Sequence, residues 1–215
     1  MANHSDLRLM YAPPSQNEPL RHWREGRIKP IGSFNSKALK LAGTLCQPCN
    51  TTRTQPFDRA WEELSRALYE RWPGVRVGDD IRTNRIFWYD TWTQMLRMHL
   101  FFLKLWGCHM FEKKATAFGL EGFANAIQNE TAHPHVYIRF GVNMVVPKRI
   151  HLLGCGDMHA DMDSADKTCR SAIWTYYVDR LALSIIYAQP GHEPASVKEA
   201  WHPSHSTTNI RLYRW

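Results

Sequence analysis

Residues 91–110 read TWTQMLRMHLFFLKLWGCHM, and this run decides the fold. It contains no proline, and its single glycine, Gly107, lies near the end, so it predicts one long helix. Apolar side chains occur on nearly every side of that helix, which indicates a central, mostly buried position. Arg97, His99 and Lys104 interrupt the apolar run, which is shorter than the ~20 apolar residues that a bilayer requires. We therefore expect no membrane span.

Two further helices are predicted on either side of this run. Before it, apolar residues recur at three- and four-residue spacing from Phe57 to Leu68. Pro56 suits the first helical turn, and Pro73 ends the pattern. After it, residues 119–128 predict a shorter helix.

The C-terminal part predicts antiparallel strands. Between residues 135 and 146, apolar side chains alternate with other residues, as on one face of a strand. These apolar residues are Val136, Ile138, Phe140, Val142 and Met144. Residues 149–159 and 173–188 predict further strands, although 177–186 is equally compatible with a helix. The pattern of helices followed by strands indicates an α+β protein.

Three segments divide the chain. Residues 1–30 are polar and interrupted by prolines and a glycine, which predicts a basic irregular arm. Residues 31–89 contain short extended pieces, a cysteine knuckle and the first helix. Residues 90–215 contain the central helix and the sheet. We expect the last two segments to share a core.

The charge of the chain favours polyanionic partners. Its 215 residues include 27 Lys and Arg against 20 Asp and Glu, a net charge of +7. Residues 1–89 carry 14 basic and 9 acidic side chains, so most of the excess lies in the N-terminal part. The five cysteines are unevenly spaced, and the first ten residues contain no apolar leader. These two features exclude a secreted disulfide scaffold and predict a cytoplasmic protein.

The most specific motif is in residues 45–61, which read LCQPCNTTRTQPFDRAW. This text resembles the C-terminal half of the HNH-endonuclease motif, and the resemblance covers about residues 31–72. In that family a ββα unit carries a metal-ligating His or Asn at the start of its helix, just after a Cys-x-x-Cys knuckle. The resemblance places Asn50 at that ligand position and Arg53 where a phosphate-contacting basic residue is common. It implies an HNH-like knuckle and helix packed with the central apolar helix and the antiparallel sheet.

The resemblance implies a metal-dependent nucleic-acid endonuclease that hydrolyses phosphodiesters, acting on DNA in particular. Cys46 and Cys49 would form half of a structural zinc site, with two ligands from elsewhere. Asn50 and His22 would hold a divalent cation such as magnesium against the phosphate. His22 would also deprotonate the attacking water. The alternatives are thiols in a metal-free turn and an ordinary exposed histidine in a mobile arm.

Two departures from the family pattern favour a second interpretation. No acidic residue stands directly before His22, and no Cys-x-x-Cys pair precedes Cys46. The alternative is a non-catalytic module on an HNH-like scaffold that binds nucleic acid or a protein partner, such as a phage-defence or anti-defence component. A zinc enzyme that uses C-terminal histidines and cysteines is a third class.

Other residues have both a functional and a structural interpretation. A basic cluster before the knuckle suits phosphate contacts, or alternatively a solvated loop. Its members are Arg21, Arg24, Arg27, Lys29, Lys37 and Lys40. Two histidine pairs flank prolines and either complete a zinc site or lie in loops near strand ends; they are His133 with His135 and His202 with His205. Most tryptophans are predicted to pack in the core; these include Trp61, Trp72, Trp88, Trp92 and Trp106.

Overall fold

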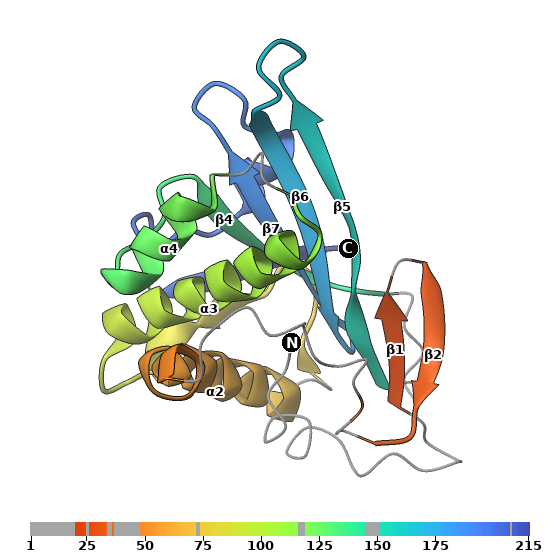
Figure 1. Cartoon of the computed structure of the whole chain (residues 1–215). Helices are drawn as coiled ribbons and strands as arrows, with labels where there is room; N and C mark the ends of the chain where they lie inside the picture. The colour runs from red at the N-terminus through yellow and green to blue at the C-terminus, as the bar shows by residue number, and fades with distance from the viewer. Residues whose placement is uncertain are drawn as a thin grey trace.

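The α+β class is confirmed in a computed structural model of the chain. The structure describes residues 20–24, 26–33, 36, 48–71, 74–115, 119–144, 151–206 and 208–215. Within these residues, eight strands form one mixed sheet in the order β2-β1-β5-β6-β7-β4-β8-β3 (Figure 1). The strands are β1 (Leu20–Arg24), β2 (Arg27–Ile31), β3 (Asp80–Arg82), β4 (Val136–Val142), β5 (His151–Met162), β6 (Cys169–Val178), β7 (Leu181–Ala188) and β8 (Asn209–Arg214).

The three predicted helices are confirmed. They are α2 (Gln55–Arg71), α3 (Thr91–Glu112) and α4 (Leu120–Gln128). Short helical turns lie at η2 (Cys49–Arg53), η4 (Thr83–Arg85) and η6 (Ala195–Glu199). The Asp90 side chain caps α3 by accepting a hydrogen bond from the Thr93 amide at 3.3 Å. None of the described helices has the length and apolar character that crossing a membrane requires.

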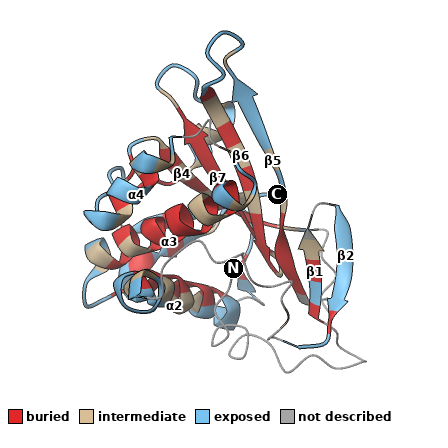
Figure 2. Ribbon diagram, viewed as in Figure 1, coloured by how far each residue is buried: buried red, intermediate tan, exposed pale blue. Residues whose placement is uncertain are grey.

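The helices cover one face of the sheet (Figure 1), and aromatic contacts join the two layers. Trp61 of α2 packs edge-on against Tyr176 of β6, with ring centroids 6.4 Å apart. From α3, Phe102 packs against Phe140 of β4. Buried residues are concentrated in α3, β6 and β7, whereas β2 and the far end of β5 are exposed (Figure 2). The core therefore lies between α3 and the centre of the sheet.

The predicted strands are present, and the segment for which a helix was equally possible also forms strands. The alternating apolar side chains of β4 are buried from Val136 to Val142, whereas Met144 lies beyond the strand and is exposed. Residues 177–186, for which a helix was the alternative, form the end of β6, the turn after it and most of β7. Asp179 allows the tight turn between them, because it takes a left-handed conformation with φ of 53°.

The sheet is larger and less regular than the predicted antiparallel sheet. Two of its pairs, β1 with β5 and β4 with β8, are parallel. The short strand β3, from the segment predicted to hold the knuckle, pairs with β8. Strand pairing therefore crosses both predicted segment boundaries.

The prediction of an irregular arm is wrong for residues 20–24 and 27–30, which lie in the strands of the β1–β2 hairpin. Gly26 makes the turn with φ of 71°, and Leu20 and Ile31 are buried at the opposite end of the hairpin. Pro30 is tolerated because β2 is at the edge of the sheet. β1 also pairs with β5, which provides the tertiary contact that holds the hairpin.

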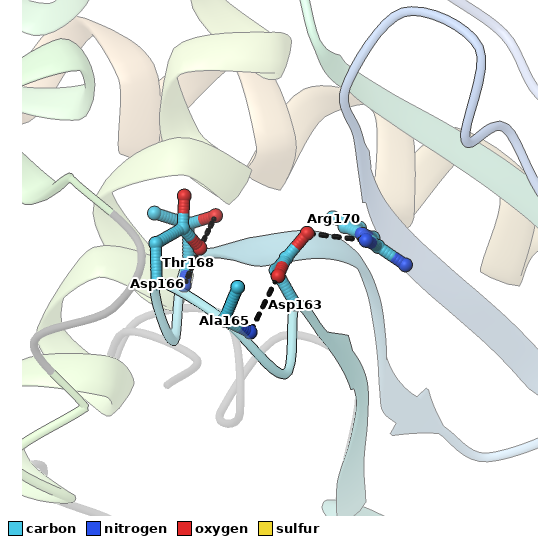
Figure 3. A network of polar contacts seen from close by, with 5 residues as sticks. All are labelled: Asp163, Ala165, Asp166, Thr168 and Arg170. Atoms are coloured by element: carbon cyan, nitrogen blue, oxygen red, sulfur yellow. Dashed lines mark hydrogen bonds and ion pairs between the residues drawn. The ribbon is translucent and has the colours of Figure 1, made fainter.

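The loop between β5 and β6 is largely exposed, but its carboxylates are engaged within the protein (Figure 3). Asp163 accepts a hydrogen bond from the Ala165 amide at 2.7 Å and pairs with Arg170. Asp166 accepts hydrogen bonds from both the amide and the hydroxyl of Thr168. These hydrogen bonds hold the pKa of both carboxyls below the usual range, so the acidic cluster is a self-contained turn.

Candidate nucleic-acid interface

The knuckle leads directly into α2. Its described part is the single turn η2, in which Asn50, Thr51, Thr52 and Arg53 are all exposed. The Thr54 amide donates to the Cys49 carbonyl at 3.0 Å and closes this turn. Asn50 and Arg53 occupy the two positions that the family resemblance singles out. Their side chains therefore face solvent from a hydrogen-bonded turn.

A buried lysine anchors the junction of η2 and α2. Lys104, from the middle of α3, forms an ion pair with Asp58 and donates to the Thr54 hydroxyl at 3.3 Å. Burial raises the pKa of Asp58, and the neighbouring Lys104 ammonium opposes that rise. Thr54 and Asp58 of the motif thus have a structural role, which is to fix the exposed turn on α3.

Sequence reasoning assigned no role to Lys104. The signal was its place in an otherwise apolar run, since a buried lysine requires an anionic or polar partner. Its partner Asp58 lies 46 residues away in sequence. No local pattern connects the two.

The structure places His22 in β1, away from Asn50. The His22 side chain is 5% exposed, and its strand lies between β2 and β5. In Figure 1, β1 is at the right of the view, just inside the edge strand β2, whereas the start of α2, which follows Asn50, is at the left. The two predicted catalytic residues are therefore not brought together, and their joint role stays a prediction.

The predicted basic residues divide between two parts of the molecule. Arg21, Arg27 and Lys29 are exposed on the β1–β2 hairpin, and the backbone of Arg24 pairs with Arg27 there. Register places Arg27 and Lys29 on the same face of the hairpin as His22, and Arg21 on the opposite face. Lys37 and Lys40 lie outside the described residues.

The knuckle cysteines do not define a metal centre within the described residues. Cys49 is half-buried, and Cys46 lies outside the described part of the chain. In that part, no three or more His, Cys, Asp or Glu side chains are grouped so as to hold a metal ion. Any zinc site formed by Cys46 and Cys49 therefore includes at least one residue whose position the structure does not describe.

The two predicted histidine pairs do meet, against the first half of α4 and beside β4. His202 bonds to the His133 carbonyl through Nε2 at 3.0 Å, and its ring lies 5.3 Å from that of His205. A fifth histidine joins them from α3, because His99 Nε2 accepts from the His133 amide at 3.2 Å. The His133 and His135 rings are 6.0 Å apart.

Burial disfavours the charged form of three of these histidines, His99, His133 and His202. It lowers the pKa of His99 far below the ordinary value, lowers that of His133 to about 4, and also lowers that of His202. Neighbouring histidines add to the effect at each of the three. Neutral rings that hydrogen-bond to backbone suit a structural role, namely the attachment of α3 to the loops before β4 and β8.

A pocket of about 170 Å³ lies beside the cluster, between the loop after η6 and β8. His205, Asn209, Arg211 and Tyr213 contribute to its lining. Near it, Arg139 pairs with Glu199 and packs over the Tyr213 ring, with 5.3 Å between the guanidinium and the ring centroid. Of the candidates from the sequence, the lining includes His202 and His205, the second histidine pair, and none of the residues of the HNH-like motif.

Two predicted core tryptophans are exposed instead. Trp61 and Trp106 are fully buried as expected, whereas Trp88 is 81% and Trp92 is 62% exposed. Trp88 precedes α3 in an irregular segment, and Trp92 is in the first turn of α3, before its burial begins at Gln94. Helical periodicity alone does not show where a helix extends past the elements that cover it.

Comparison with protein-family models, with curated proteins and with solved structures found no match for this chain.

Proposed function

We propose that the protein binds nucleic acid through the exposed turn η2, as a non-catalytic module on an HNH-like scaffold. The observation that carries the proposal is the pairing of an exposed, basic turn with a buried anchor. Arg53 and Asn50 project from a turn whose far end is tied to Lys104 through Thr54 and Asp58. A fixed backbone reduces the ordering cost of phosphate binding by the arginine.

The charge of the chain supports the same proposal. A net charge of +7 attracts a polyanion at long range, and arginine suits phosphate because its planar group donates two parallel hydrogen bonds. The exposed Arg27 and Lys29 on the β1–β2 hairpin add a second basic surface. The separation of His22 from the start of α2 supports a binding module over an enzyme.

A second candidate, metal-dependent phosphodiester cleavage, is favoured by one observation. Asn50 is exposed immediately before the helix, in the position that the family resemblance assigns to a cation ligand. A divalent cation bound there would stabilise negative charge on the phosphate. The described residues provide Asn50 alone for this purpose, so we assign no further catalytic step.

One experiment separates the two candidates. Fluorescence anisotropy with labelled duplex DNA measures binding by the full chain and by Arg53→Ala. Plasmid nicking with added magnesium or manganese measures cleavage by the full chain and by Asn50→Ala. Binding that weakens in Arg53→Ala, without nicking, supports the binding module. Nicking that disappears in Asn50→Ala supports the enzyme.

The control for charge is Arg170→Ala, which removes an arginine that is engaged by Asp163 in the β5–β6 loop. Its affinity for DNA should equal that of the unmodified protein. Equal affinity of Arg53→Ala and the unmodified protein would contradict the proposed role of η2.

A further inference from the structure

Three adjacent aromatic side chains form an exposed patch where the chain enters α3. Trp88, Tyr89 and Trp92 are 81%, 50% and 62% exposed, and we call them the aromatic patch. The Trp88 and Tyr89 rings meet edge to face, with centroids 5.9 Å apart. Large aromatic groups clustered in solvent are unfavourable unless something binds them, so the patch indicates an interaction site.

The patch is attached to the exposed side of α2. The Tyr89 hydroxyl donates to a carboxylate oxygen of Glu63 at 2.8 Å. Burial and this carboxylate raise the pKa of Tyr89 to about 12, so the hydroxyl remains a donor at neutral pH. The hydrogen bond fixes the patch beside the middle of α2.

Arginines flank the patch on two sides. Arg59 and Arg66 are exposed on α2 and are seven residues apart, so they share the helix face that also carries Glu63. Arg82 and Arg85 are exposed in the segment just before Trp88. These four side chains supply positive charge on the two segments that the Tyr89–Glu63 hydrogen bond joins.

The two nearest carboxylates are already engaged inside the protein. Glu63 accepts from Tyr89, and Asp90 caps α3 through the Thr93 amide. Exposed arginines on the same segments as exposed aromatic rings are the composition of sites that hold unpaired nucleotides.

The path from η2 to the patch suits a nucleic-acid strand. Eight residues of α2 separate its start at Gln55 from Glu63, which corresponds to about 12 Å of helix. At about 3.4 Å per nucleotide of a stacked strand, that length matches three or four nucleotides. A strand whose phosphate contacts Arg53 reaches Trp88 within a few nucleotides.

We propose that the aromatic patch binds the unpaired bases of a nucleic-acid strand whose backbone runs along α2. Trp88 and Trp92 stack on the bases, and Arg59 and Arg66 contact the phosphates. The inference rests on the proposed nucleic-acid binding at η2, and it specifies the substrate class as single-stranded nucleic acid or duplex with an unpaired extension.

The test compares a labelled single strand of about 12 nucleotides with the duplex of the same sequence, by fluorescence anisotropy on the full chain. The double variant Trp88→Ala/Trp92→Ala should lose roughly tenfold or more of its single-strand affinity, because stacking on each base is lost. Its duplex affinity should change less than about twofold. Trp88→Phe/Trp92→Phe retains rings and should recover most of the single-strand affinity.

A matched control is Met162→Ala, which removes an exposed apolar side chain at the far end of β5. It should leave both affinities unchanged. Circular dichroism checks that each variant is folded, which we expect because the replaced side chains are exposed.

The outcomes distinguish this inference from the proposed function. Unchanged single-strand affinity in the double alanine variant overturns the inference, and a patch that serves a protein partner would give that result. If Arg53→Ala then still weakens duplex binding, the proposed function stands alone. Loss of single-strand affinity in the tryptophan variant, with no effect of Arg53→Ala, supports the patch and overturns the role of η2. An absence of DNA and RNA binding overturns both.

Discussion

The buried pair between Lys104 and Asp58 gives a stability prediction whose size follows from the structure. Lys104→Met retains a long apolar stem but removes the only cation paired with Asp58 among the described residues. Removing one partner of a buried pair costs about 3–5 kcal/mol, and the 18% exposure of the Asp58 side chain lets water reduce that cost. We therefore expect Lys104→Met to lose about 2–3 kcal/mol of unfolding free energy.

The double variant Lys104→Met/Asp58→Leu should be close to the unmodified protein, within about 1 kcal/mol. Burial is the largest influence on the Asp58 pKa and raises it, so burial disfavours the ionised carboxylate more than Lys104 stabilises it. A carboxyl with a raised folded pKa contributes stability at acid pH that is lost as the pH rises through that pKa. Lys104→Met should accordingly recover part of its lost stability as the pH falls toward about 4.

Urea unfolding followed by circular dichroism measures these differences, and thermal unfolding provides a check. A loss of about 2–3 kcal/mol in a chain of this length corresponds to a fall in Tm of roughly 4–12 °C. The reasoning is refuted if Lys104→Met is within about 0.5 kcal/mol of the unmodified protein, or if the double variant is as unstable as the single one.

Three further predictions concern other parts of the fold. Burial lowers the pKa of His133 to about 4 in the folded protein, against about 6.5 in the unfolded chain, so the unfolded chain binds protons more readily. The free energy of unfolding should therefore fall below pH 6.5, by roughly 2–3 kcal/mol near pH 4. Urea midpoints that do not change with pH would contradict this. Gly154→Ala should detach β1 from β5, because the added methyl group collides with the Trp23 carbonyl. Hydrogen exchange of the β1 amides should then increase. Native protection of these amides in the variant would show that the strands adjust. Burial raises the pKa of the Cys169 thiol to about 11, and Cys155 is also buried. Both thiols should therefore resist a thiol reagent until the protein unfolds. Rapid labelling of either thiol in the folded protein would contradict the packing.

The helices and β4 were predictable because their information is local. Residues 91–110 combine a proline-free sequence with apolar side chains on nearly every face, and α2 repeats its apolar residues from Phe57 to Leu68. The alternating pattern from Val136 to Val142 marks one buried face of a strand. Each of these signals depends on residues within a few positions of one another.

The hairpin of β1 and β2 was not predictable in the same way. Gly26 and Pro30 are usual marks of irregular structure, and both are present in the hairpin. The strand that holds β1 in the sheet is β5, which begins at His151, and no short-range pattern connects the two. The same long separation in sequence hides the contact between Lys104 and Asp58.

The candidate site was predictable in part. The resemblance placed Asn50 at the start of a helix, whereas the structure has Asn50 and Arg53 in the exposed turn η2, which leads into α2. The sequence could not show that Thr54 and Asp58 serve as anchors, or that Trp88 is exposed, because both depend on tertiary packing. The pairing of His22 with Asn50 came from the family resemblance, and it stays a prediction.

The central claim is that this chain binds nucleic acid through basic side chains on its surface. Its most direct test is the affinity of the unmodified protein for labelled DNA with an unpaired extension, measured from about 50 to about 200 mM salt. The logarithm of the affinity should fall linearly with the logarithm of the salt concentration, with a smaller slope in Arg53→Ala. Absence of binding at the lowest salt, or a salt slope that Arg53→Ala leaves unchanged, would contradict it.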